Sequence, residues 1–94
     1  MPAVIINHRV ANFSSWLKVF EEHAPFRQAA GFRDAAVWQA SGDPNNVFIY
    51  MEGDDLYKMQ AFGQSEELKQ VMQSAGVITP PQIQLLENGK QYQY

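Results

Sequence analysis

Val47-Phe48-Ile49-Tyr50-Met51-Glu52 is the stretch that decides the fold, because it is the clearest β-strand of the chain. β-Branched and aromatic residues dominate it, as they do in strands. Side chains alternate between the two faces of a strand, so Phe48 and Tyr50 lie on one face and Val47, Ile49 and Met51 on the other. Both faces are apolar, and each therefore requires a layer that covers it.

The sequence before this stretch predicts a strand and then a broken helix. Residues 4–10 are rich in β-branched side chains and predict the first strand. Asn12 is a suitable N-cap for the helix that follows, in which apolar residues recur at helical spacing. Pro25 disfavours helical geometry in the residue before it, so we expect the helix to break or kink there. Gly31 stands where a left-handed residue commonly ends a helix.

A hairpin follows this helix. Residues 32–40 predict a second strand, and residues 41–46 read Ser-Gly-Asp-Pro-Asn-Asn, which is dense in turn-forming residues. We therefore expect a polar loop over 41–46 that joins the strand 32–40 to the strand 47–52 in antiparallel fashion.

The rest of the chain predicts a second broken helix and a final strand. Asp54 can cap the helix, and Asp55 suits the positive end of its dipole. A glycine interrupts this helix, and Ser65 caps its second segment. Residues 83–87 predict the last strand, which we expect to resume beyond residue 89 toward the C-terminus.

The element order is therefore β-α-β-β-α-β, which predicts an α+β, ferredoxin-like domain over residues 1–94. This order folds as a four-stranded antiparallel sheet with two helices on one face. The helices can cover only one of two apolar faces, and a bare apolar sheet face is rare on a monomer. We therefore expect a homodimer in which two sheets pair into a barrel. The pattern does not decide which face of the sheet meets the helices.

Composition excludes several classes of protein. The chain has 94 residues, a net charge of −3, no cysteine and no cluster of Lys and Arg. An acidic chain is repelled by a phosphate backbone, so we expect no nucleic-acid partner. The N-terminus has no basic region followed by a long apolar run, so we expect no signal segment and no membrane span. Together with the lack of cysteine, this predicts a cytoplasmic protein.

Several short patterns, spread over nearly the whole chain, carry a resemblance to a known superfamily. They are His8-Arg9-Val10, Trp16, Phe20, His23-Ala24-Pro25, Arg27 to Gly31, Asp43-Pro44-Asn45, Asp54-Asp55-Leu56, Phe62, Ser65, Glu67-Leu68 and Ala75-Gly76-Val77. In these patterns the chain resembles the dimeric α+β barrel superfamily, with its antibiotic-biosynthesis-monooxygenase-like, stress-responsive and small bacterial "cyclase-like" proteins. The resemblance implies a pocket between the sheet and the helices of each subunit.

Members of that superfamily include cofactor-independent quinone-forming monooxygenases, haem-degrading enzymes, polyketide cyclases and lactone isomerases. The haem-degrading branch uses an Asn on the first strand, a role that the resemblance gives to Asn7, and a Trp and a His on the second helix. Phe62 and Met72 stand near those last two positions here, which disfavours that branch. The cyclase branch uses a His late in the chain, and none follows His23.

His8 and His23 are the candidate catalytic residues. His8 shares a strand face with Val4, Ile6 and Val10, and His23 follows Trp16 by seven positions on one helical face. Histidine can act as a general base near neutral pH. The alternatives are a buried histidine that bonds a backbone carbonyl, for His8, and a helix-end histidine that meets the helix dipole, for His23.

Six large side chains are candidates for binding a flat apolar ligand, because aromatic residues and Met commonly line such pockets. They are Trp16, Phe20, Trp38, Tyr50, Phe62 and Met72. The alternative is that they fill an ordinary core. Arg27 and Arg33 flank the same region. They either attract an anionic substrate, or are solvated or paired with Glu21 and Asp34.

No metal or prosthetic group is expected from the sequence. Glu52, Asp54 and Asp55 form an acidic cluster that could hold a hard cation, but helix capping explains it more simply. No HExxH element, EF-hand loop, glycine-rich phosphate loop or Cys nucleophile is present.

Two functions remain open. The first is a cofactor-independent monooxygenase, cyclase or isomerase that acts on a small aromatic or polyketide-like molecule, with His8 or His23 as proton acceptor and Tyr50 or Trp38 positioning the ligand. The second is a non-catalytic dimeric module that binds a ligand or a partner protein. A cavity of about 300 Å³ or more beside His8 would favour the enzyme, and filled space there would favour the module.

Overall fold

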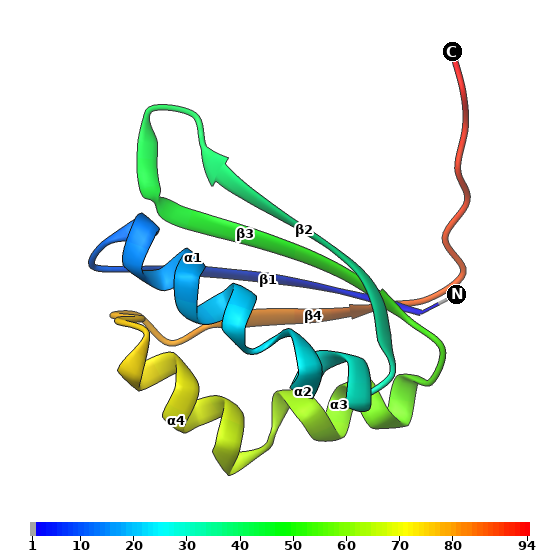
Figure 1. Cartoon of the computed structure of the whole chain (residues 1–94). Coiled ribbons are helices and arrows are strands. Elements are labelled where there is room, and N and C mark those ends of the chain that lie inside the picture. The colour runs from blue at the N-terminus through cyan, green and yellow to red at the C-terminus, as the bar shows by residue number, and fades with distance from the viewer. Residues whose placement is uncertain (1) are drawn as a thin grey trace.

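A four-stranded antiparallel sheet carries its helices on one face (Figure 1), as the element order predicts. The computed structural model describes residues 2–94, apart from the side chain of Asp34. Within these residues the order of the strands across the sheet is β2-β3-β1-β4. The elements are β1 (Ala3–Arg9), α1 (Phe13–Glu22), α2 (Ala24–Ala29), β2 (Phe32–Ala40), β3 (Asp43–Gly53), α3 (Leu56–Gly63), α4 (Glu66–Ser74) and β4 (Gln82–Leu86).

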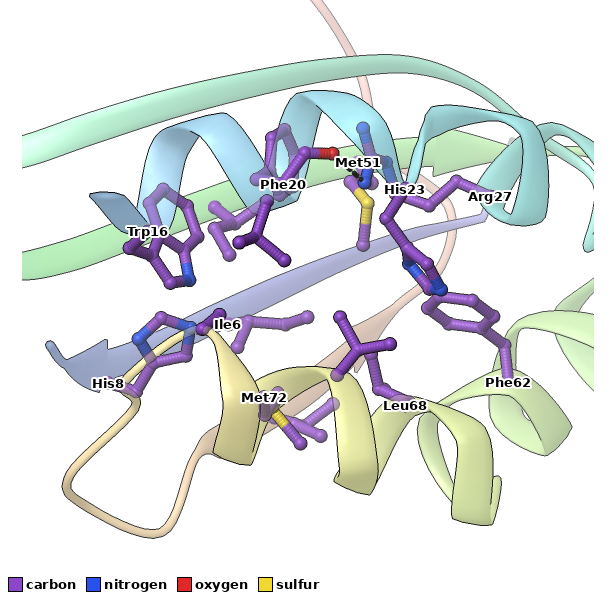
Figure 2. A pocket seen from close by; sticks show the side chains of 15 residues that line it. Ile6, His8, Trp16, Phe20, His23, Arg27, Met51, Phe62, Leu68 and Met72 are labelled. Atoms are coloured by element: carbon purple, nitrogen blue, oxygen red, sulfur yellow. Dashed lines mark hydrogen bonds between the residues drawn. The ribbon is translucent and has the colours of Figure 1, made fainter. Parts of the chain in front are cut away.

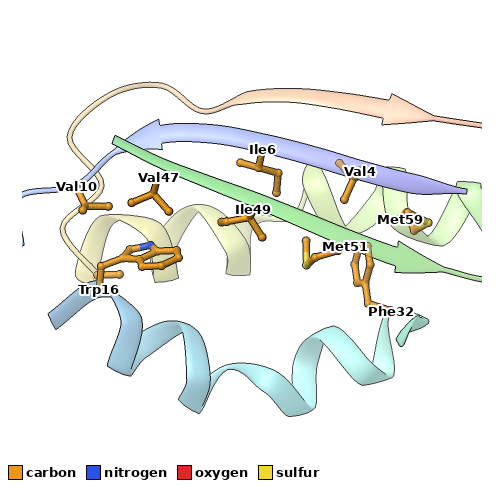
Figure 3. Close-up of a cluster of buried hydrophobic side chains, with 10 residues drawn as sticks. Val4, Ile6, Val10, Trp16, Phe32, Val47, Ile49, Met51 and Met59 are labelled. Atoms are coloured by element: carbon orange, nitrogen blue, oxygen red, sulfur yellow. The ribbon is translucent and has the colours of Figure 1, made fainter. Parts of the chain in front are cut away.

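The burial of side chains on β1 shows which face of the sheet the helices cover, a question that the sequence left open. On β1, Val4, Ile6 and His8 are buried, whereas Ile5 and Arg9 are exposed. The strand pairing places Val4 opposite Met51, Ile6 opposite Ile49 and His8 opposite Val47. Figure 3 shows these apolar side chains between the sheet and the helices, together with those of Trp16, Phe32 and Met59. The helices therefore cover the face of His8.

Side-chain caps start three of the helices. The backbone N–H of Ser15 donates to Asn12 Oδ1 at 3.0 Å, and that of Leu68 donates to Ser65 Oγ at 3.2 Å, as predicted. The expectation that Asp54 caps α3 is wrong: the cap is Asp55, which accepts from the N–H groups of Tyr57 and Lys58. No helix within residues 2–94 is long and apolar enough to cross a membrane.

The break between α1 and α2 lies at His23, with Pro25 in the first turn of α2. Proline is tolerated there because the first N–H groups of a helix have no partner within the helix. Gly31 ends the second segment with φ +93°, a left-handed conformation that glycine adopts at little cost. The predicted interruption of the helix therefore places His23 at the junction of two segments.

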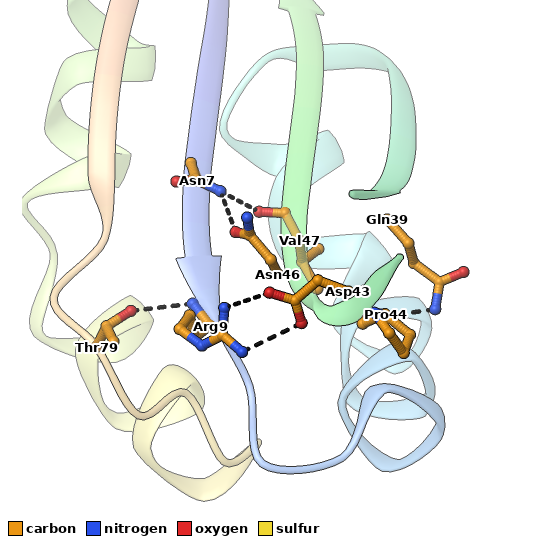
Figure 4. A network of polar contacts seen from close by, with 8 residues as sticks. All are labelled: Asn7, Arg9, Gln39, Asp43, Pro44, Asn46, Val47 and Thr79. Atoms are coloured by element: carbon orange, nitrogen blue, oxygen red, sulfur yellow. Dashed lines mark hydrogen bonds and ion pairs between the residues drawn. The ribbon is translucent and has the colours of Figure 1, made fainter. Parts of the chain in front are cut away.

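The hairpin loop is shorter than predicted. The turn contains only residues 41–42, Gly42 has φ +78°, and β3 already begins at Asp43. Figure 4 shows why the polar residues that follow belong to the sheet: the Arg9 guanidinium donates twice to the Asp43 carboxylate, at 2.6 and 3.1 Å, and Asn7 Nδ2 donates to Asn46 Oδ1 at 2.8 Å. These bonds to β1 hold a turn-like sequence in an extended strand.

The predicted continuation of the last strand beyond residue 89 is wrong. Residues 87–94 form no helix or strand and run away from the sheet (Figure 1). Asn88 has φ +59°, which turns the backbone out of the extended conformation of a strand. The last strand ends at Leu86.

The face of the sheet that points away from the helices, called here the outer face, carries large exposed apolar side chains. The pairing of Ile5 with Tyr50, of Asn7 with Phe48 and of Trp38 with Phe48 places them side by side on this face. Trp38 is 66% exposed, Ile5 39% and Phe48 37%. In the single chain no layer covers this apolar surface.

Candidate functional site

A cavity lies between the sheet and the helices (Figure 2). Its free volume is about 50 Å³. Six of the eight predicted site residues line it, namely His8, Trp16, Phe20, His23, Phe62 and Met72. The other lining residues are Ile6, Val19, Arg27, Ile49, Met51, Leu68, Val71, Ala75 and Ile83. The structure therefore brings most of the candidates together at one place.

Helical and strand periodicity explain this convergence. Trp16, Phe20 and His23 are spaced four and three residues apart, so they lie on one face of the helical segment. His8 alternates with exposed neighbours on β1 and points to the same side of the sheet. From the opposite side, Phe62 at the end of α3 and Met72 on α4 close the cavity.

An aromatic wall runs along one side of the cavity. The His8 and Trp16 ring centroids lie 5.5 Å apart, edge to face, and the Trp16 and Phe20 rings stack at 5.2 Å. The Arg27 guanidinium continues the row, with Cζ 3.7 Å from the centre of the Phe20 ring. Offset and edge contacts of this kind favour rigid ring positions, and they present flat surfaces to whatever occupies the cavity.

Both histidines are buried and incompletely bonded. His8 is 4% exposed and His23 8%. His8 Nδ1 and His23 Nε2 have no hydrogen-bond partner among the described residues. An unpartnered buried polar atom costs about 1–3 kcal/mol, so a hydrogen bond to either nitrogen would be favourable.

Burial holds both imidazoles in the neutral form near pH 7. It lowers the pKa of His8 below the ordinary value of 6.5, because the charged form is poorly solvated there. Burial is also the main cause that lowers the pKa of His23; the positive charge of Arg27 adds to it, and the negative charge of Glu67 opposes it. A neutral imidazole can accept a proton from a bound ligand.

Trp38 and Tyr50 do not line the cavity. Both lie on the outer face, where Tyr50 pairs with Ile5 and Trp38 with Phe48, so their predicted part in ligand binding is not supported by this cavity. The Tyr50 hydroxyl donates to Glu52 Oε1 at 2.8 Å. The strand alternation already separates them from the residues that flank His8, but it could not say on which side the helices pack.

Asn7 also lies on the outer side of the sheet. Its Nδ2 donates to Asn46 Oδ1 at 2.8 Å and to the Val47 carbonyl oxygen at 3.0 Å. Asn7, to which the resemblance gives a role in the haem-degrading branch, does not line the cavity between the sheet and the helices.

The acidic cluster divides among separate tasks. Glu52 accepts from Tyr50, Asp54 pairs with Arg33 at 3.2 Å, and Asp55 caps α3. Among the residues that the structure describes, no three His, Asp or Glu side chains are grouped as a metal site would require. Capping and pairing account for these acids.

Arg27 lines the cavity, and the sequence left open whether it contacts a ligand. It is half-buried, and its Nη1 donates to the Phe20 carbonyl oxygen at 2.6 Å. The sequence predicted only that it flanks the candidate ligand-binding residues, because the helical period of α1 cannot be carried through the break before α2. Arg33, by contrast, is more than half exposed and pairs with Asp54 outside the cavity.

Known structures share this fold. A protein from Bordetella bronchiseptica provisionally described as an antibiotic biosynthesis monooxygenase superposes with a TM-score of 0.77 at 15% identity, over 95% of this chain and 97% of that chain. SnoaB from Streptomyces nogalater, a cofactor-independent oxygenase, superposes with a TM-score of 0.76 at 11% identity, over 96% of this chain and 94% of that chain.

The two comparisons of sequence give no such relative. No family model matches the chain, and no curated protein matches it. The structural matches confirm the expected fold, that of the antibiotic-biosynthesis-monooxygenase-like α+β proteins.

Proposed function

We propose that this chain is a cofactor-independent monooxygenase that takes a flat hydroxyaromatic molecule into the cavity, with His8 as the proton acceptor. The observation that carries the proposal is the pair of buried imidazoles with unpartnered nitrogens beside one aromatic-walled cavity. The shared fold with SnoaB, a cofactor-independent oxygenase, supports the reaction class.

His8 suits the role of proton acceptor better than His23. Burial is the main cause that lowers the pKa of both histidines, so position rather than pKa separates them. His8 is held on a central strand and against the Trp16 ring, so its position is fixed. A base works best when it is pre-positioned within hydrogen-bond reach of the proton that it removes.

The reaction needs only the ligand, dioxygen and this base. His8 takes the phenolic proton, and the electron-rich phenolate that results transfers electrons to dioxygen. A C–O bond forms at a ring carbon that loses hydrogen, and the second oxygen atom leaves as water. In balance, one phenol and one dioxygen give one quinone and one water. The apolar wall keeps other water from the reacting carbon.

The cavity must widen to admit such a ligand. Its free volume of about 50 Å³ is below the roughly 300 Å³ of an ordinary ligand pocket. One wall comes from α4, none of whose residues is fully buried, and it includes the flexible side chain of Met72. We therefore expect α4 to move outward when a ligand binds, since this helix has least packing to lose.

In this proposal the working unit is a homodimer. The outer face exposes Trp38, Ile5 and Phe48, an apolar area that a second sheet of the same kind would cover. Each chain then keeps its own cavity on the opposite side of its sheet, so the dimer supports the sheet on which His8 lies.

The second candidate function, a non-catalytic binding module, is favoured by the small free volume of the cavity. It differs from the first in one result. Only the enzyme consumes dioxygen in the presence of a hydroxyaromatic ligand.

The test is dioxygen uptake with 1-naphthol and with anthrone, combined with the thermal denaturation of the protein in their presence. We expect a rise in melting temperature of a few degrees at ligand concentrations well above Kd, and dioxygen uptake matched by quinone formation. Stabilisation without uptake would favour the binding module. No effect of any hydroxyaromatic on either measurement would overturn the proposal.

A matched pair of variants shows whether the ligand sits in the cavity. Met72→Trp adds bulk to the cavity wall, whereas Gln73→Trp adds the same bulk at the neighbouring exposed position. We expect the first variant to abolish the ligand-induced stabilisation and the second to retain it. Overpacking costs about 1–3 kcal/mol, so each variant is compared with its own ligand-free melting temperature.

A further inference from the structure

The Arg27 side chain is fixed at one end of the cavity. Its Cζ lies 3.7 Å from the centre of the Phe20 ring, and its Nη1 donates to the Phe20 carbonyl oxygen at 2.6 Å. In Figure 2 the Arg27 side chain runs back to Phe20 and the His23 ring points toward Phe62, and both lie away from His8. The cation is therefore held at the cavity wall by two contacts with one residue.

This cation lacks an acidic partner among the described residues. The ion pairs of those residues engage Arg9, Arg33 and Lys69. Burial alone lowers the pKa of Arg27, whereas Glu67 acts on neighbouring His23. A guanidinium has five N–H donors, and the bond to Phe20 uses one of them. A half-buried cation with unused donors favours the binding of an anion from outside the chain.

His23 adds a second group at the same end. Its Nε2 is buried and has no hydrogen-bond partner among the described residues, and His23 and Arg27 both line the cavity. A neutral imidazole with its proton on Nε2 donates a hydrogen bond. Arg27 and His23 thus each offer a hydrogen-bond donor to a molecule in the cavity.

The distance to the other end sets the size of the ligand. His8 contacts Trp16, and His23 follows Trp16 by seven residues on the same helical face. At 1.5 Å per residue, these two places are about 10 Å apart along the helix. Two fused aromatic rings with a substituent at each end span about this distance.

We propose that Arg27 and His23 form an anion-binding site for the substrate, which is an aromatic acid whose carboxylate binds these two residues while its hydroxyl faces His8. The inference rests on the proposed function, whose substrate class it narrows. Arg27 selects the substrate and orients it, and His8 acts on the hydroxyl at the far end.

The test compares three bicyclic probes by calorimetry: 6-hydroxy-2-naphthoate, 2-naphthoate and 2-naphthol. We expect the unaltered protein to bind 6-hydroxy-2-naphthoate about 10- to 100-fold more tightly than 2-naphthol, as a charge-assisted bond warrants. Arg27→Gln is expected to remove this preference, so that the acid and 2-naphthol bind with similar affinity. Arg33→Gln removes the same charge from a residue outside the cavity and keeps the preference.

Two further measurements separate the possible failures. Arg27→Lys keeps the charge and is expected to keep part of the preference, which guards against a loss of folding in Arg27→Gln. Dioxygen uptake with each probe, in the unaltered protein and in a His8→Gln variant, reports on the proposed function independently.

Equal affinity for 2-naphthol and the acids overturns the anion site, and His8-dependent dioxygen uptake with 2-naphthol would then leave the proposed function standing. Arg27-dependent binding of the acids without any His8-dependent uptake upholds the anion site and overturns the oxygenase. Failure of the unaltered protein to bind any of the three probes overturns both.

Discussion

A Trp38→Glu variant is expected to sediment as a single chain at concentrations where the unaltered protein sediments as a dimer. Trp38 is 66% exposed in the single chain, so its replacement leaves the fold of that chain intact. At a paired outer face it would remove a large aromatic contact and bury an unpaired charge. Each of these costs several kcal/mol, and we expect the dimer to weaken at least about 100-fold.

Sedimentation velocity at micromolar concentration measures this directly. Gln70→Glu is the matched control, because it adds the same charge on α4, away from the outer face. A single-chain mass for the unaltered protein would contradict the dimer, and so would a Trp38→Glu protein that stays as dimeric as the control.

A His8→Gln variant is expected to lose about 100- to 10,000-fold in kcat/KM for dioxygen-dependent quinone formation, the usual contribution of a general base. Glutamine keeps a polar side chain of similar length but cannot take up the proton. Circular dichroism and the melting temperature show whether the variant is folded. A variant that is folded and fully active would contradict the role of His8.

The pH dependence of the same reaction has a definite sign. The base must be neutral, and burial places the pKa of His8 below 6.5, so activity holds as pH falls to 6.5 and declines only below it. The stability of the fold changes in the same direction. As the pH is lowered below about 6.5, the histidines of the unfolded chain take up protons before those of the folded chain do, so the free energy of unfolding decreases as the pH decreases. A His8→Gln protein shows a shallower decline in stability.

The fold could be predicted from the sequence because each element carries a local signal. The strand from residue 47, the caps Asn12 and Ser65 and the break at Pro25 all act within a few residues. The wrong predictions concern segments whose structure depends on residues far away in the sequence. Asp43 and Asn46 belong to the sheet because Arg9 and Asn7 on β1 bind them, and no signal near residue 43 indicates this.

The candidate site could be predicted only in part. Helical spacing brought Trp16, Phe20 and His23 to one face, and strand alternation grouped His8 with apolar neighbours. Trp38 and Tyr50 could not be assigned to a face because both faces of β3 are apolar, and the choice between them depends on where the helices pack. Likewise the sequence, in which Glu21 and Glu22 lie near Arg27, could not show that Arg27 has no acidic partner among the described residues of the fold.

The two tryptophans allow a direct test of where the ligand sits, since Trp16 lines the cavity and Trp38 lies on the opposite face of the sheet. We would titrate 1,8-dihydroxyanthraquinone into a Trp38→Phe protein and, as the control, into a Trp16→Phe protein, and follow the remaining tryptophan emission. The cavity site predicts saturable quenching of Trp16 with little quenching of Trp38; quenching confined to Trp38, or none that saturates, would contradict it.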